Sequence, residues 1–138
     1  MSQAPFLADP ARGPEPFLLD ASALLALGAG NQFLSGLVSR THPQSNRFLY
    51  VPAMCLAAAT AQRPALAAHI GGLEAIEVLN LGYDDASAAG AEIAEGADWQ
   101  VAHALVAAGP SAEWPQGLPV LTVETGPYKA RGISATPV

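Results

Sequence analysis

Short apolar runs alternate along this chain with longer stretches rich in alanine and leucine. The apolar runs are bounded by polar or turn residues, as in strands buried on both faces, and they lie at 17–19, 48–51, 75–81 and 119–123, with a short edge strand expected at 133–135. The stretches between them hold strong helix formers and predict helices over 21–29, 32–39, 53–61, 64–70, 84–95 and 98–108. Strands that alternate with helices predict an α/β fold with a parallel sheet and right-handed crossovers.

The first 16 residues differ in composition from the rest, because they contain four prolines and few apolar anchors. We expect a flexible leader over 1–16 and a single domain over 17–138. No apolar run approaches the ~20 residues of a membrane-spanning helix, and the chain begins without the features of a signal peptide. The one cysteine, Cys55, lies in an apolar segment and predicts a buried, reduced thiol. These features predict a cytoplasmic protein that does not enter a membrane.

Charge narrows the range of functions. Twelve acids against six bases give a net charge of −6, and the bases form no run. Proteins that bind RNA or DNA tightly by themselves usually carry a clustered basic surface, because they neutralise phosphates. The composition therefore counts against autonomous nucleic-acid binding. It leaves open a small site that handles a phosphodiester through metal ions.

Polar residues collect where the predicted strands end. Asp20 directly follows the first strand, and Ser22 comes two residues later. Thr122 and Glu124 lie at the end of the fourth strand, and Asp98 begins the helix that leads into it. Ligands of open parallel sheets bind at the carboxyl ends of the strands, so we expect the three carboxylates to meet at one edge.

Clustered carboxylates repel one another unless they are protonated or bound to a cation. Hard oxygen ligands with room for water are typical of a Mg²⁺ or Mn²⁺ site, and such an ion activates water and clamps phosphoryl oxygens. Each residue also has a structural interpretation. Asp20 and Asp98 suit helix N-caps, Ser22 is an ordinary first-turn residue, and Glu124 suits an exposed loop. Taken one residue at a time, these patterns favour the structural interpretation.

Four segments in this order resemble the successive blocks of a PIN domain: FLLDASALLAL, YVPAMCLAAAT, DWQVAHALVAA and LPVLTVETGPYKA. The family includes the toxin ribonucleases of bacterial toxin–antitoxin pairs, and the resemblance runs from about Phe17 to the C-terminus. It implies a three-layer α/β/α sandwich with a short central parallel sheet. It also implies a Mg²⁺-dependent endoribonuclease site built from acids.

The resemblance assigns roles to individual residues. Asp20 matches the first acid of the family, and Ser22 matches the small hydroxyl residue that often follows it. Asp98 matches the acid at the start of the late helix. Glu124 stands where the family usually has an aspartate after a Thr-x pair, here Thr122-Val123. The implied catalytic, metal-binding set is therefore Asp20, Asp98 and Glu124, supported by Ser22 and Thr122.

One acid of the family is missing. A glutamate usually lies in the helix after VPA, and Ala58 occupies the equivalent place here. Loss of a ligand or its support commonly costs ~10–100-fold in metal affinity or activity. The resemblance therefore implies a weakened metal site.

Three functional hypotheses follow. The first is a toxin-type, Mg²⁺- or Mn²⁺-dependent endoribonuclease that acts on RNA. The second is a catalytically degenerate PIN-like domain that acts as a protein-interaction module. The third, an unrelated doubly wound domain that binds a small ligand, requires the four-segment match to be coincidental. The resemblance also implies a homodimer and an antitoxin-like partner, either of which would cover the alanine-rich helices that start near Ala53 and Ala86.

The three histidines, His42, His69 and His103, are not at metal-ligand spacing from one another. We interpret His103 as a packing residue. Trp99 and Trp114 are too far apart in sequence to suggest a base-stacking platform, which favours core or interface roles.

Overall fold

The computed structural model describes residues 13–138, so most of the predicted leader lies outside the described residues. Every predicted strand and helix has a counterpart there, with bounds that shift by a few residues. The short helix α7 was not predicted, and β5 starts two residues later than expected. The elements in chain order are β1 (Glu15–Leu19), α1 (Ala21–Gly28), α2 (Gln32–Ser39), β2 (Arg47–Pro52), α3 (Ala53–Gln62), α4 (Leu66–Gly71), β3 (Ile76–Leu79), α5 (Tyr83–Ala94), α6 (Trp99–Ala107), β4 (Val120–Thr122), α7 (Gly126–Lys129) and β5 (Ala135–Pro137).

The five described strands form one sheet in the order β3-β2-β1-β4-β5, and all four pairings are parallel. Strand β1 is central, and its Leu18 pairs with Tyr50 on one side and Val120 on the other. The chain first builds outward from β1 to β2 and β3, then returns to place β4 and β5 on the opposite side of β1. This reversal creates a topological switch point at the carboxyl ends of β1 and β4.

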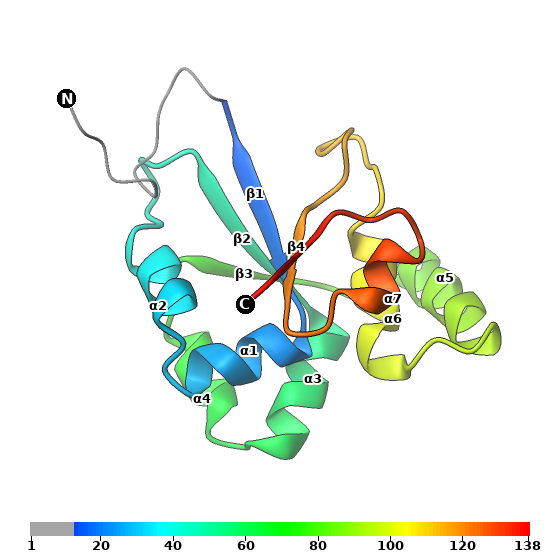
Figure 1. The fold of residues 1–138 in the computed structure, drawn as a ribbon, viewed down its shortest axis with the longest axis horizontal. Coiled ribbons are helices and arrows are strands. Elements are labelled where there is room, and N and C mark those ends of the chain that lie inside the picture. The colour runs from blue at the N-terminus through cyan, green and yellow to red at the C-terminus, as the bar shows by residue number, and fades with distance from the viewer. Residues whose placement is uncertain (1–12) are drawn as a thin grey trace.

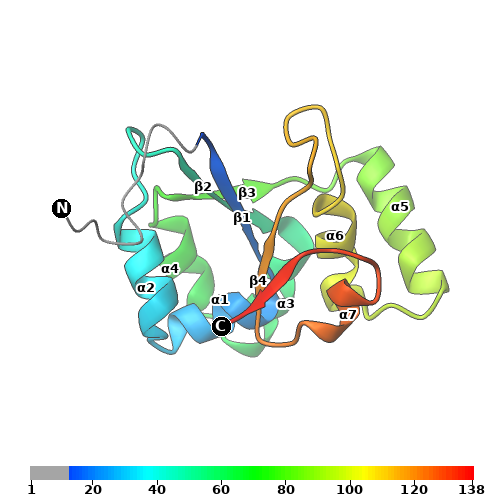
Figure 2. The ribbon, with the colours of Figure 1, turned by 45° about the horizontal axis from the view of Figure 1, so that its top comes forward.

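Helices cover both faces of the sheet. Figures 1 and 2 show α1 to α4 grouped on one side and α5, α6 and α7 on the other. The change of side follows from right-handed crossovers, because the chain reverses its direction across the sheet after β3. The result is the predicted three-layer α/β/α sandwich with a short parallel sheet.

The hydrophobic core lies against the central strands. Leu18, Leu19 and Val120 have no exposed surface, and Leu121 is 1% exposed, as expected of apolar runs buried on both faces. The edge strand β3 is only partly buried, and its Val78 is exposed. Among the described residues no single helix is both long and apolar enough to cross a bilayer, although α1 and α2, bent by 91°, would together pass on length and composition.

Candidate functional site at the carboxyl ends of β1 and β4

Asp20 lies at the switch point, directly after β1, where it is the N-cap of α1 and only 2% exposed. Its Oδ1 accepts hydrogen bonds from the Ser22 hydroxyl at 2.7 Å and the Ala23 backbone N–H at 3.0 Å. Its Oδ2 accepts hydrogen bonds from the Thr122 hydroxyl at 2.6 Å and the Tyr128 hydroxyl at 2.7 Å. A carboxylate offers about four lone-pair sites, so these donors use all of its accepting capacity.

Two of the three hydroxyls that donate to Asp20, those of Ser22 and Thr122, also organise the turn after β4. The Ser22 Oγ accepts the Val123 backbone N–H at 2.9 Å and lies 3.2 Å from the Thr122 Oγ1. The Thr122 Oγ1 accepts the Glu124 backbone N–H at 3.2 Å. The predicted Asp20, Ser22 and Thr122 therefore come together, and their bonds connect the end of β4 to the first turn of α1.

Tyr128 is the member of this cluster that sequence reasoning missed. It lies on α7, and its side chain has no exposed surface. Burial raises the pKa of its phenol, and the nearby charge of Asp20 raises this pKa further. The hydroxyl therefore stays protonated and donates. The sequence contains little that predicts this contact, because α7 has four residues and only Pro127 marks its start.

The other two predicted metal ligands are exposed. Asp98 is the N-cap of α6, where its Oδ1 accepts the Gln100 backbone N–H at 2.9 Å. Glu124 is also exposed, in the turn after β4. Ala58, at the place of the missing glutamate, is 2% exposed and packs in the core. Across residues 13–138, no three His, Cys, Asp or Glu side chains are grouped to hold a metal ion. With Asp20 already saturated, the donor set in this arrangement does not fit Mg²⁺.

Cys55 lies near Asp20 without joining the cluster. Its thiol is fully buried and donates to the Gln100 carbonyl at 3.5 Å. Burial raises its pKa to about 12, and the charge of Asp20 adds to the rise. The thiol is thus protonated at neutral pH, and the prediction that it is buried is confirmed.

His103 on α6 is also fully buried. Its Nδ1 accepts the backbone N–H of Met54 at 3.3 Å, which satisfies one of the otherwise unpaired donors in the first turn of α3. The neutral ring therefore carries its proton on Nε2. Burial lowers the pKa of this imidazole, and the charge of Asp85 opposes the lowering.

We expect His103 to make the protein less stable in mild acid. Because its folded-state pKa lies below 6.5, the unfolded chain binds a proton that the folded protein does not bind between these two values. The stabilising contribution is complete above pH ~6.5 and is lost as the pH falls below it. Urea unfolding at a series of pH values from neutral to acid, for wild type and His103→Gln, measures this. If wild type and His103→Gln lose the same free energy of unfolding as the pH falls, His103 is not responsible and the prediction is wrong.

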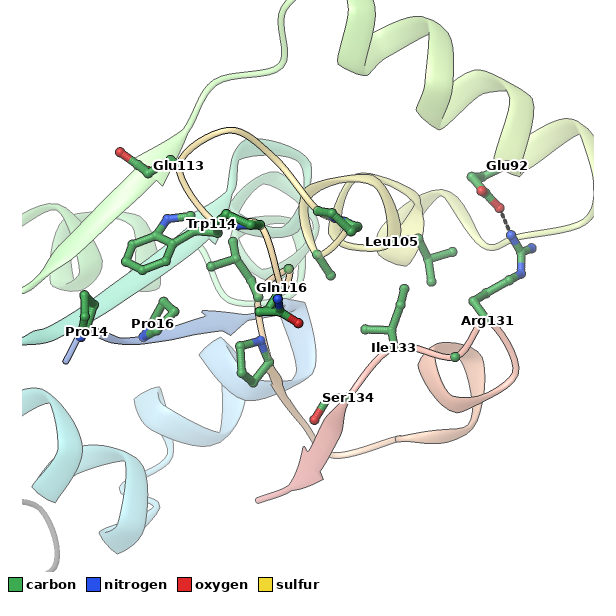
Figure 3. Close-up of a pocket in the computed structure, with 18 residues that line it drawn as sticks. Pro14, Pro16, Glu92, Leu105, Glu113, Trp114, Gln116, Arg131, Ile133 and Ser134 are labelled. Atoms are coloured by element: carbon green, nitrogen blue, oxygen red, sulfur yellow. Dashed lines mark hydrogen bonds and ion pairs between the residues drawn. The ribbon is translucent and has the colours of Figure 1, made fainter. Parts of the chain in front are cut away.

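A sizeable cavity lies away from the Asp20 cluster. It has a volume of about 850 Å³ and lies at the amino ends of the strands, between Pro16 of β1, Pro119 before β4 and Ser134 before β5. Figure 3 shows Trp114 at one end and the ion pair of Glu92 with Arg131 at the other. The two charges of that pair offset one another, and the rest of the lining is dominated by proline, glycine and apolar residues.

Comparison of the chain with protein-family models and with the sequences of curated proteins finds no match.

Proposed function

We propose that this chain is a PIN-like domain that acts by binding a protein partner and has lost metal-dependent hydrolysis. The observation that carries the proposal is the saturated carboxylate of Asp20. All four of its accepting sites are used by donors of the protein itself, and one of these, the Tyr128 hydroxyl, is held by a fully buried ring. A metal ion would have to displace at least one of these donors.

The exposed acids and the missing glutamate support the same conclusion. Asp98 and Glu124 face solvent, and the buried Ala58 adds no carboxylate. Recruiting the two acids to Asp20 would bring three negative charges together, and these would repel one another unless a cation or protons offset them.

Support for a binding role comes from α5. Of its 12 residues only Ala89 is buried, and Tyr83 at its start is 85% exposed. Trp99, at the start of α6, is 44% exposed. Exposed aromatic side chains are enriched at protein interfaces. The predicted homodimer and antitoxin-like partner would both suit such a surface and stay predictions.

The Mg²⁺-dependent endoribonuclease remains a second candidate, because one observation favours it. Asp20, Ser22 and Thr122 gather at the switch point of the sheet, where α/β proteins bind their ligands. In this candidate the acids would act on RNA once the Tyr128 hydroxyl leaves Oδ2.

Calorimetric titration of Mn²⁺ and Mg²⁺, combined with an RNA cleavage assay, separates the two candidates. We expect wild type to bind neither ion at millimolar concentration and to leave RNA intact. Tyr128→Phe frees one accepting site on Asp20 without changing the ring, so weak Mn²⁺ binding confined to this variant would support the saturation argument. Metal binding and RNA cleavage by wild type, both lost in a folded Asp20→Asn variant, would overturn the proposal in favour of the nuclease.

The binding role has its own measurement. Pull-down from an extract of the source organism should recover a partner with wild type and lose it with the double variant Tyr83→Ser, Trp99→Ser. Sedimentation of the purified protein measures whether that partner is a second copy. Equal recovery by the double variant would place the interface elsewhere on the molecule.

A further inference from the structure

Helix α5 lies at the outside of the molecule, and most of its surface faces solvent. Figures 1 and 2 show α6 between α5 and the sheet, and α6 is the main packing partner of α5. Of the 12 residues of α5 only Ala89 is buried. Helices of this length are marginal in water by themselves, and burial of one apolar face normally stabilises them. Most of α5 is therefore uncovered in the free domain.

One side of α5 carries a stripe of apolar and small residues. The stripe has four exposed members at the i, i+3, i+7 and i+10 spacing of a single helical face: Tyr83, Ala86, Gly90 and Ile93. We call these four residues the α5 stripe. Tyr83 is 85% exposed and Ile93 is 40% exposed. Two large side chains with two small residues between them suit the ridges-into-grooves packing of a second helix.

Gly90 is the member of the α5 stripe that the free domain does not explain. Its φ lies outside the left-handed region, and a Cβ added there would meet nothing within 4 Å. Glycine in the interior of a helix lowers its stability relative to alanine. Within residues 13–138, no contact therefore requires a glycine at this position. A second helix that crosses α5 at Gly90 would require one, because the missing side chain lets two backbones approach closely.

The charge around the α5 stripe decides which kind of helix fits. Residues 64–128 contain no lysine or arginine, although nine of the twelve acids of the chain lie there. Asp84 in the first turn of α5 and Glu95 directly after its last turn are both exposed. Arg131, which follows α7, is already paired with Glu92. The surface that covers the stripe must therefore supply the positive charge.

Other occupants fit this surface less well. Two copies of α5 packed on each other would bring the same acids together, and like charges across an interface are costly. Nucleic acids and anionic membranes attract basic surfaces, so the absence of lysine and arginine around α5 disfavours both. A protein helix with an apolar face and flanking bases meets both the shape and the charge.

We propose that the α5 stripe binds a basic amphipathic helix of a protein partner. An apolar side chain of that helix lies over Gly90, between Tyr83 and Ile93. The lysines or arginines of the helix lie near Asp84 and Glu95. This inference rests on the proposed binding role and adds the chemistry of the partner.

Two synthetic helical peptides test the charge of the partner. Both have blocked ends and the same stripe of leucines, and their polar faces carry lysine in one peptide and glutamate in the other. Titrated into ¹⁵N-labelled protein and followed by NMR, the lysine peptide should shift the amide signals of Ala86, Gly90 and Ile93. The glutamate peptide should bind at least about tenfold more weakly, because its acids face those of α5. Added salt should weaken the lysine peptide, because the charges involved are exposed.

Gly90→Gln and Ala88→Gln form a matched pair of variants. Both positions are exposed, and both changes add the same neutral side chain, which is a good helix former. Ala88 lies four positions after Asp84, on the side of α5 away from the stripe. We expect Gly90→Gln to weaken the lysine peptide about tenfold or more, because its side chain takes the place of the docked one. We expect Ala88→Gln to leave the affinity unchanged. Gly90→Gln should also unfold at a higher temperature than wild type, which would show that the loss of binding is not a loss of fold.

Three results of the peptide experiment would overturn the proposal. Absence of any shift with the lysine peptide at millimolar concentration would mean that the α5 stripe is not a docking surface. Equal affinity for the glutamate peptide would mean that only apolar contact is used. Equal weakening by Gly90→Gln and Ala88→Gln would mean that the net charge of the protein attracts the peptide without a defined surface.

Self-association is a fourth outcome that would overturn it. A dimer of the purified protein that is lost in Gly90→Gln, measured by sedimentation, would mean that a second copy covers the stripe. The proposed function fails on other measurements, namely metal binding and RNA cleavage by wild type. If the pull-down recovers a partner that depends on Tyr83 and Trp99 while both peptides fail to bind, the binding role stands and only the basic helix is excluded.

Discussion

Replacement of Asp20 with alanine should lower the free energy of unfolding by about 3 kcal/mol, a large fraction of the stability of an ordinary domain. The substitution removes the N-cap of α1 and leaves the hydroxyls of Thr122 and Tyr128 buried without their acceptor. Loss of a cap costs ~1 kcal/mol, and each stranded buried donor costs ~1–3 kcal/mol. Relief from burying a charge offsets part of this sum. Urea unfolding followed by circular dichroism measures the result.

Asp98→Ala is the matched control for this experiment. Asp98 is also a helix N-cap, but it is exposed, and its side chain accepts a hydrogen bond from the Gln100 backbone N–H. We expect its loss to cost about 1 kcal/mol. The excess in Asp20→Ala measures the buried network that joins β1, β4 and α7. Equal costs would show that Asp20 is a simple cap, and the saturation argument for the site would fail.

Gly117→Ala should cost about 3 kcal/mol or more, because two effects add at this buried position. The backbone of Gly117 has φ +80°, in the left-handed region where a side chain is disfavoured. A Cβ added there would lie 2.5 Å from the Ala108 carbonyl oxygen, which accepts the Leu118 N–H. The clash is with backbone at the end of α6, so no side-chain rotation relieves it.

Gly132→Ala separates the two effects. Gly132 has a similar φ of +72°, but an added Cβ would meet nothing within 4 Å. Its substitution should therefore cost only the conformational strain, about 1–2 kcal/mol. Thermal and urea unfolding of both variants gives the comparison. If the two variants lose the same stability, the loop before β4 moves freely enough to accept the extra atom.

The pattern of apolar runs was enough to predict the α/β class. Leu18, Leu19, Val120 and Leu121 form runs without polar interruption, and the structure buries them on both faces of a parallel sheet. The starts of α1 and α6 could also be predicted from the sequence. Aspartate is a preferred N-cap residue, and Asp20 and Asp98 occupy the N-cap positions of these helices. The edge strand β5 was placed two residues too early, since a three-residue strand carries little periodicity.

The contacts of Asp20 at the candidate site could be predicted only in part from the sequence. Asp20, Ser22 and Thr122 could be grouped in advance, because each lies at or just after the carboxyl end of a predicted parallel strand. The structure then places the ends of β1 and β4 side by side. Nothing in the sequence indicated that Tyr128 would supply another donor to Asp20, because α7 is too short to show a helical pattern. The metal site expected from the family resemblance thus stays a prediction, and the contacts of Asp20 argue for the alternative.

Local patterns in the sequence determine some features of this protein, and tertiary packing determines others. Periodicity, capping residues and strand–helix alternation act over a few residues, and they carry the fold class and the approximate element bounds. Asp20 accepts hydrogen bonds from Thr122 and Tyr128, 102 and 108 positions away in the chain, and the His103 Nδ1 accepts one from Met54, 49 positions away. Such partners are set by packing between helices and strands, which no short window of sequence contains. The chemistry of the carboxylate and of the imidazole follows from that packing.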